Sequence, residues 1–538
     1  MALWSLSKQK LLIVDDFPDM RGMMRSIVTS MGATDIQTAS NGDEAVSLIE
    51  FNRFNIILCD YNLGDGKDGQ QVLEEVRYRE LLPFTTIFIM VTAENSALMV
   101  HGALEYAPDD YLSKPVTRAT LIARLRHLMV RKERLSPVLA AMDRRCFPEA
   151  LKQCEALLEA GNEGRHDLLQ LKGRLLTEIG EYDAACAFYQ ETLRERSLPW
   201  MMLGLGRAQV YTQQYAQAIE VLEGLIQVQP GLCLAYDLLA EALAGQGELA
   251  RAQEVVMQAI AVSPKPSMRH RYLGQLAYRQ GNFEAAENAF RTALRLSKGS
   301  YLRSFAEYTD LARAQIMKGD VMSAMKALRD MQREYKQDAC VKAQSALLEW
   351  AAQCKNGGGE AATQLSDEVA EQFNKQPELI SSDIAWFVGK LCLESGKTDF
   401  AKSLLRHVLI NQPDNPVIHE QVLEAFAGAG LGAEGKAAVN SVNAELDKLY
   451  QDGSHLARLG QLEEAIAFFE QAAQPLPENK NINLAVVDYL IRFMQKHGKT
   501  PELMQKARTY LERIRRMAEN TAQYRRLKSQ LNQIAASV

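Results

Sequence analysis

The feature that most constrains the fold is a repeating helical pattern that runs from about residue 140 to the end of the chain. Small residues recur about every 34 residues at two positions of this pattern: Gly206, Ala240 and Gly274, and then Ala218, Ala252 and Ala286. Pro230 and Pro264 follow the second helix of a unit, since proline cannot continue a helix. One such unit cannot bury its apolar face alone, so the pattern predicts an all-α superhelix of stacked helical pairs.

The Leu-Gly pairs at 205–206 and 273–274, together with the recurring small residues, resemble the tetratricopeptide repeat (TPR). The resemblance implies a concave face that binds another protein. It is interrupted at Gly357-Gly-Gly359, where we expect an irregular helical pair or a loop. The expected segments are a helical connector at 133–164, TPR repeats at 165–334, an irregular helical segment at 335–380, degenerate repeats at 381–515 and a basic helix at 516–538.

The first 132 residues follow a different pattern, in which short apolar runs alternate with segments of helical spacing. The runs that predict strands are 10–16, 35–39, 55–58, 86–91 and 110–113. The segments that predict helices are 18–31, 42–52, 69–82, 95–106 and 116–132. Continuous apolar strands separated by helices indicate a five-stranded parallel sheet covered on both faces. We therefore expect a doubly wound α/β domain at residues 1–132.

Polar residues stand where these apolar runs end. Asp15 and Asp16 end the first run, Asp60 and Thr92 end two others, and Lys114 follows the last. Open α/β sheets build their sites at this carboxyl edge, so the residues should converge. Clustered carboxylates repel one another and are most readily held by a hard divalent cation such as Mg²⁺. An Asp beside that cation can accept a phosphoryl group, while a lysine and a hydroxyl bind the transferred oxygens.

These residues resemble the receiver domain of the response-regulator family, which has a flavodoxin-like fold. The strongest motifs are Ile-Ile-Leu-Cys-Asp60, Met-Val-Thr92-Ala-Glu and Asp-Tyr-Leu-Ser-Lys114-Pro. The resemblance implies that Asp60 is the phosphoacceptor. It further implies that Mg²⁺ is bound by the side chains of Asp15, Asp16 and Asp60 and by the backbone carbonyl of Asn62.

The same resemblance assigns the switch residues. Thr92 and Lys114 would bind the phosphoryl group, Tyr111 would be the switch aromatic, and Pro115 would follow a cis peptide bond. The loop at 61–69 departs from the family pattern, because it lacks the usual Met-Pro turn and is one residue longer. Its aspartates suggest a calcium loop, but the closing glutamate of that motif is missing, so we expect a solvated turn.

Composition and charge narrow the function further. The eight cysteines are scattered without a CxxC pair, which is typical of reduced, mostly buried thiols. No apolar run approaches the ~20 residues that cross a bilayer, and the N-terminus does not resemble a signal peptide. We therefore expect a cytoplasmic protein without a membrane partner. The net charge of −6 predicts no strong general affinity for polyanions.

Together the two parts predict a two-component response regulator. A histidine kinase or phosphotransfer protein would phosphorylate Asp60, and phosphorylation would switch the binding of a partner protein in the TPR groove. We do not expect an enzyme, because the receiver would catalyse only its own phosphorylation and dephosphorylation. The helix at 116–132 runs into residues 135–139 without a flexible linker. This stiff junction can pass a change to the repeats or form a homodimer interface.

The sequence leaves two alternatives open. Residues 496–528 hold ten Lys or Arg against three Glu, so the C-terminal helix can be a nucleic-acid site. We prefer a basic helix that caps the superhelix, because no helix-turn-helix, zinc finger or RNA-binding signature accompanies it. In the other alternative, the protein is a phosphate sink or inhibitor that competes with another response regulator for one kinase.

Overall fold

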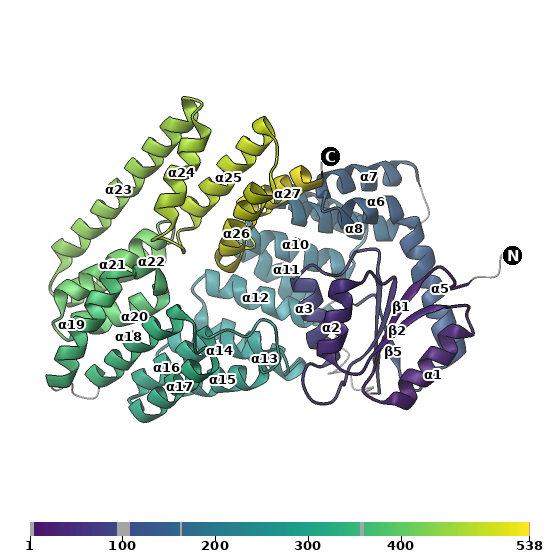
Figure 1. The fold of residues 1–538 in the computed structure, drawn as a ribbon, viewed down its shortest axis with the longest axis horizontal. Helices are drawn as coiled ribbons and strands as arrows, with labels where there is room; N and C mark the ends of the chain where they lie inside the picture. Colours follow the sequence, from purple (N-terminus) through teal and green to yellow (C-terminus); the bar gives the residue numbers. More distant parts are fainter. Residues whose placement is uncertain (1–4, 94–107, 162–163, 356–359, 537–538) are drawn as a thin grey trace. The chain divides into compact units, whose positions relative to one another are not determined.

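The computed structural model describes residues 5–93, 108–161, 164–355 and 360–536 (Figure 1). It divides into two compact units. The first contains residues 1–276 and 292–304, which are the α/β domain, the connector and the first helical pairs. The second contains residues 277–291 and 305–538, which are the later helical pairs.

The α/β domain is built on five parallel strands in the order β2-β1-β3-β4-β5. The strands are β1 (Lys10–Val14), β2 (Asp35–Ala39), β3 (Ile56–Asp60), β4 (Ile87–Thr92) and β5 (Asp110–Ser113). This confirms the predicted five-stranded parallel sheet. The chain leaves β1 for β2 on one side and returns to β3 on the other. The switch point of the topology therefore lies between the carboxyl ends of β1 and β3, where such sheets bind ligands.

Helices cover both faces of the sheet. They are α1 (Pro18–Thr29), α2 (Gly42–Phe51), α3 (Gly69–Tyr78) and α5 (Arg118–Arg134). Leu12 and Val14 of β1 pack with residues of α2 and α3 in one core, whereas Leu11 and Ile13 pack with α1 and α5 in the other. Alternate residues of a strand point to opposite faces, which explains why these strands are apolar throughout. The predicted helix at 95–106 lies outside the described residues.

The end of α3 corrects one predicted boundary. Spacing predicts a helix to residue 82, but α3 ends at Tyr78 and is capped by Arg79. Glu80 then adopts a left-handed φ of 56°, which turns the chain away from the helix axis. Leu82 is buried although it lies beyond the helix, so its apolar character reflects core packing and not helical spacing.

The receiver continues into the helical part without a linker. Leu135 is both the C-cap of α5 and the N-cap of α6 (Ser136–Asp143), and α7 (Phe147–Glu159) follows. We call the apolar core at this junction the connector cluster. Its buried members are Leu135, Val138, Leu139, Ala141, Met142, Phe147, Ala150, Cys154, Leu168 and Leu175, with Phe84 of the receiver packed against them.

Antiparallel helical pairs follow in the first unit. They are α8 (Arg165–Ile179) with α9 (Tyr182–Glu195), α10 (Pro199–Tyr211) with α11 (Tyr215–Val228), and α12 (Cys233–Gly245) with α13 (Leu249–Val262). The next two helices, α14 (Ser267–Arg279) and α15 (Phe283–Leu296), are each divided between the two units. Small residues lie where the helices cross. A Cβ at Gly206 would stand 2.6 Å from Leu222, and one at Gly173 would stand 2.2 Å from Tyr189. The small positions of the repeat are therefore sites of close helix packing.

The described residues of the second unit form further helices. These are α16 (Ala306–Lys318), α17 (Val321–Glu334), α18 (Ala339–Lys355), α19 (Glu360–Lys375), α20 (Ser382–Glu394), α21 (Thr398–Asn411), α22 (Pro416–Gly428), α23 (Gly432–Arg458), α24 (Leu462–Ala473), α25 (Lys480–His497), α26 (Pro501–Ala518) and α27 (Ala522–Ala536). At 335–380, α18 and α19 are regular helices on either side of the glycines, which themselves lie outside the described residues. The segment expected at 516–538 begins inside α26, because that helix extends to Ala518.

No helix in the described part of the chain combines the length and the apolar composition needed to span a bilayer.

Candidate functional site

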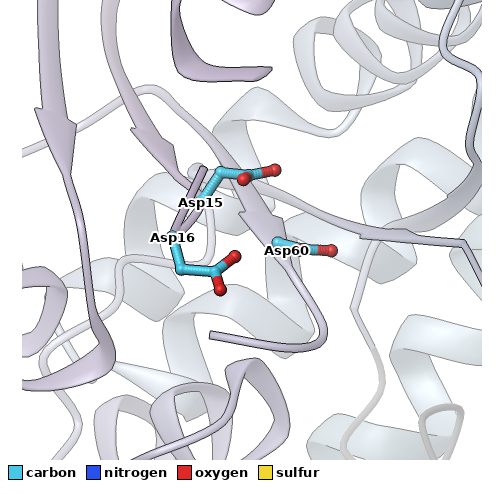
Figure 2. A group of neighbouring side chains, drawn as sticks. All are labelled: Asp15, Asp16 and Asp60. Carbon is cyan, nitrogen blue, oxygen red and sulfur yellow. The ribbon is translucent and has the colours of Figure 1, made fainter. Parts of the chain in front are cut away.

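Three carboxylates meet at the carboxyl edge of the sheet. Asp15 and Asp16 follow β1 and Asp60 ends β3, and one oxygen of each lies within 4.8 Å of the others. Figure 2 shows that their side chains extend to the same side. Asp15 and Asp60 are only 1% and 5% exposed. Burial of like charges is unfavourable, so this cluster needs cationic partners.

Lys114 supplies one of these partners. Its Nζ lies 2.9 Å from Asp15 Oδ2 and 2.9 Å from Asp60 Oδ2, so it bridges the two strands. Burial disfavours the charge of Lys114, but the two carboxylates outweigh this effect and raise its pKa above the usual value. The Lys114 backbone N donates to Thr92 O at 2.7 Å, and the peptide bond before Pro115 is cis.

The electrostatic environment of the cluster shifts the pKa of Asp60. Burial raises the pKa of its carboxyl above the usual value, Lys114 opposes the rise and Asp15 adds to it. The carboxylate is therefore held where its negative charge is poorly solvated. A cation or an electrophile that approaches it meets a nucleophile with little competing hydration.

The cluster fits a divalent cation. Asp16 Oδ1 is buried and accepts no hydrogen bond from the part of the chain that the structure describes. A buried carboxylate oxygen without a donor is costly, and a hard cation with oxygen ligands such as Mg²⁺ removes that cost. Asn62, whose carbonyl the family resemblance adds to the ligands, is exposed in the loop that follows Asp60. Its role as a ligand stays a prediction.

The loop at 61–69 is a turn held by its own hydrogen bonds. Asp68 is the N-cap of α3 in a capping box with Gln71, and Gly69 N donates to Tyr61 O at 2.9 Å. Asp65 is exposed, as expected for a solvated turn. Gly64 has a φ of 71°, and a Cβ there would stand 3.3 Å from Asp16 Oδ2. The longer loop therefore brings its backbone close to the carboxylates without adding a side chain.

The predicted switch residues occupy neighbouring strands. Thr92 ends β4, is 6% exposed and lies opposite Ser113 of β5 in the sheet register. Tyr111 of β5 is half-buried and packs against the core under α2 and α3. Thr92 and Lys114 thus reach the same edge as the carboxylates. The movement of Thr92 and Tyr111 on phosphorylation stays a prediction.

Two cations near the site were not predicted from the sequence. Arg21 of α1 donates through Nη1 to the backbone oxygens of Asp15, at 2.6 Å, and Asp16, at 3.1 Å. Its place in the first turns of the helix that follows the acid pair could have suggested it. Lys265, between α13 and α14, holds Nζ 4.5 Å from the Tyr61 ring centroid. No local pattern in the sequence indicates this second contact.

Comparison with known proteins agrees with this geometry. Residues 11–126 match the family model of the response regulator receiver domain. Chemotaxis protein CheY-3 of Vibrio cholerae is 31% identical over 116 residues, which is 22% of this chain and 88% of that protein. The chain belongs to the response-regulator family. Transcriptional regulatory protein AfsQ1 of Streptomyces coelicolor is 29% identical over 184 residues, which is 34% of this response regulator and 77% of AfsQ1.

A solved structure and two further family models also match. The chemotaxis response regulator CheY4 of Vibrio cholerae is 28% identical, with a TM-score of 0.21, over 22% of this chain and 98% of CheY4. Residues 201–231, 238–301 and 273–339 match tetratricopeptide-repeat models. The chain is thus a receiver domain followed by TPR repeats, as predicted. The degenerate repeats expected at 381–515 lie beyond the matched residues and stay an interpretation.

Several cations of the C-terminal basic segment are engaged within the second unit. Arg515 lies 3.7 Å from a Glu512 carboxylate oxygen, and Lys506 lies 3.1 Å from one of Glu470. Lys499 donates to the backbone oxygens of Ile534, at 3.1 Å, and Ala535, at 2.9 Å, which caps the end of α27. These contacts favour the capping interpretation of the basic helix over a nucleic-acid site.

Proposed function

We propose that a histidine kinase or phosphotransfer protein phosphorylates this response regulator on Asp60, and that phosphorylation switches the binding of a partner protein by the TPR repeats. The observation that carries the proposal is the buried Asp60 carboxylate, which Lys114 bridges to Asp15. Beside them lies an Asp16 oxygen for which the described residues provide no donor. This arrangement provides a nucleophile, a fixed positive charge and a cation site on one edge of the sheet.

Asp60, Lys114 and Thr92 have different roles in the proposed reaction. An oxygen of Asp60 attacks the phosphorus of a phosphohistidine, the P–N bond breaks, and the imidazole leaves with the bonding electrons. Lys114 Nζ, now between Asp15 and Asp60, pairs with the transferred phosphoryl oxygens, and the Thr92 hydroxyl donates to another of them. Asp15, Asp16 and Asp60 would hold Mg²⁺, which would supply positive charge to the phosphoryl oxygens. We propose no catalysis beyond this phosphorylation and its reversal.

The repeats provide the output in this proposal. Stacked helical pairs present a long concave face, which suits a protein better than a small molecule. Phosphorylation should change the affinity for that protein by a factor of about 5–150, the usual range of allosteric coupling. We place this activity in the cytoplasm, because eight free cysteines, six of them buried, fit a reducing compartment.

Labelling by a small phosphodonor tests the proposal directly. The full chain is incubated with acetyl phosphate and Mg²⁺, and the added phosphoryl mass is measured in wild type, Asp60→Asn and Asp65→Asn. Asp65 is a matched control, because it is an exposed aspartate of the neighbouring loop. We expect labelling of wild type and Asp65→Asn and none of Asp60→Asn. Full labelling of Asp60→Asn would refute the assignment of the phosphoacceptor.

A further inference from the structure

Two loops of the helical repeats contact helix α3 of the receiver. One loop, 263–266, joins α13 to α14, and the other, 297–304, follows α15 and leads towards α16. Both loops and the receiver belong to the first compact unit. We call this set of interactions the α3 contact, and it consists of Lys265, Lys298, Ser300 and Tyr301 against Tyr61, Asp68, Gln71, Glu74, Tyr78 and Arg79.

The second loop follows one stripe of α3. Gln71 Nε2 donates to Lys298 O at 3.4 Å, and Ser300 Oγ donates to Glu74 Oε2 at 2.9 Å. The Tyr301 ring lies 5.8 Å from the Tyr78 ring. Gln71, Glu74 and Tyr78 are three and four residues apart, so they lie on the same helix face. The loop therefore meets a continuous surface of α3.

The first loop contacts residues that flank Asp60 and the start of α3. Lys265 Nζ lies 4.5 Å from the ring centroid of Tyr61, the residue after Asp60, and 3.9 Å from Asp68 Oδ2, the N-cap of α3. The first residue of α3, Gly69, packs closely against the backbone of Asp60, because a Cβ at Gly69 would stand 2.1 Å from Asp60 O. A change at Asp60 is therefore transmitted directly to the residues that Lys265 touches.

We infer that the loops 263–266 and 297–304 are a docking surface for α3, and that Lys265 makes this docking respond to the phosphorylation of Asp60. The inference rests on the proposed function, because it needs Asp60 as the phosphoacceptor. A phosphoryl group on an Asp60 oxygen converts the carboxylate into an acyl phosphate and adds negative charge beside Tyr61 and Asp68. Lys265 is attracted by that charge, so phosphorylation tightens the contact. By linkage, the docked repeats then stabilise the phosphorylated receiver by the same factor.

The chemistry of the contact suits a reversible device. Tyr301 is 48% exposed, and the side chains of the Lys265–Asp68 pair are 38% and 28% exposed. Solvent-exposed pairs of this kind contribute little to stability, so the contact can open without unfolding either domain. The segment that docks on the two loops is α3 of the same chain.

The experiment uses the full chain and beryllium fluoride with Mg²⁺ as a phosphoryl mimic. Hydrogen exchange of residues 69–78 reports docking, and the mimic concentration at half-saturation reports its coupling to the site. The variants are Lys265→Ala, Lys265→Arg and Lys298→Ala. Lys298→Ala is the matched control, because it removes the same charge from the other loop but keeps the backbone oxygen that accepts from Gln71.

We expect the mimic to slow exchange of α3 in the wild type. Lys265→Ala should lose that added protection and need about fivefold more mimic, the lower end of allosteric coupling. Lys265→Arg should restore the α3 protection and the half-saturating concentration, because a guanidinium also stacks on an aromatic ring. Lys298→Ala should behave as wild type. Equal half-saturation and equal α3 protection in Lys265→Ala and wild type would overturn the inference.

Failure of the proposed function has a different signature. A wild-type chain that takes neither acetyl phosphate label nor mimic would refute phosphorylation of Asp60, and with it the response of Lys265. Docking itself is judged without any mimic, by exchange of α3 in Tyr301→Ala. Faster exchange supports the docking surface, and unchanged exchange overturns it.

Discussion

Two of the places where the described receiver meets the helical part of the first unit differ in chemistry. At the connector cluster, Phe84 packs edge-on against Phe147, with 6.3 Å between the ring centroids. Val138 and Met142 of the same cluster are fully buried. At the α3 contact, a lysine, a serine and an exposed tyrosine meet polar and aromatic side chains of α3. The first interface resembles a domain core, and the second resembles a transient interface.

The difference indicates a division of roles. The connector cluster also adjoins the α5–α6 junction, where Leu135 alone separates the two helices. Opening it would expose apolar surface and bend this junction, so it should hold in both states of the receiver. The α3 contact adjoins the carboxylates and holds few apolar groups. It is the part that a change of charge at Asp60 can move.

The largest expected effect comes from the connector. Phe147 is 3% exposed, so Phe147→Ala should lower the free energy of local opening of α6 and α7 by about 3–5 kcal/mol. Hydrogen exchange of residues 136–159 measures this, with Phe51→Ala as the control, because Phe51 is 84% exposed and should have little effect. An equal loss of protection in α3 would show that the two contacts are not independent.

Acid should act on the charged site at the sheet edge. The pKa of Asp60 is raised by burial, so ionised Asp60 destabilises the metal-free receiver. Its stabilising contribution is present below the unfolded pKa and is lost as the pH rises through the folded pKa. Asp60→Asn, which has no charge to bury, should therefore unfold at a higher temperature than wild type at neutral pH. Each unit of pKa shift corresponds to about 1.4 kcal/mol.

Two conditions sharpen this prediction. Thermal unfolding of wild type and Asp60→Asn is compared from neutral pH to pH ~4 in the presence of a chelator, and the difference should shrink in acid as Asp60 takes up a proton. Mg²⁺ at neutral pH should also shrink it, because the cation stabilises the ionised carboxylates of the wild type. A wild type that is more stable than Asp60→Asn without metal at neutral pH would contradict the argument.

The smallest expected effect comes from the α3 contact. Tyr301→Ala removes the ring pair with Tyr78 and the contact with Arg79, 5.5 Å from the ring centroid, and should cost about 0.5–1.5 kcal/mol of local stability. Exchange of residues 69–78 should rise while that of 136–159 stays constant. A loss at 136–159 as large as that of Phe147→Ala would end the distinction between a permanent and a reversible contact.

The site could be predicted from the sequence because its residues carry local signals. Asp15, Asp60 and Lys114 each follow an apolar run, and parallel strands present their carboxyl ends on one edge. The end of α3 could not be predicted, because Leu82 keeps the apolar spacing although a left-handed φ at Glu80 has already turned the chain. Lys265 lies between two prolines in a loop, and nothing near it specifies Tyr61 as its partner.

The sequence by itself determined the five parallel strands, the carboxylate cluster and the repeated helical pairs. These follow from apolar spacing, from residues at strand ends and from small residues at helix crossings, which are properties of segments shorter than one repeat. Only the tertiary structure decided which loops meet α3. A contact between segments far apart in the chain depends on the rotation between successive helical pairs, added over all the pairs that separate them. No single repeat specifies that total rotation. The carboxylate cluster that would hold Mg²⁺ is therefore predictable from local sequence. The α3 contact that would respond to phosphorylation of Asp60 is not.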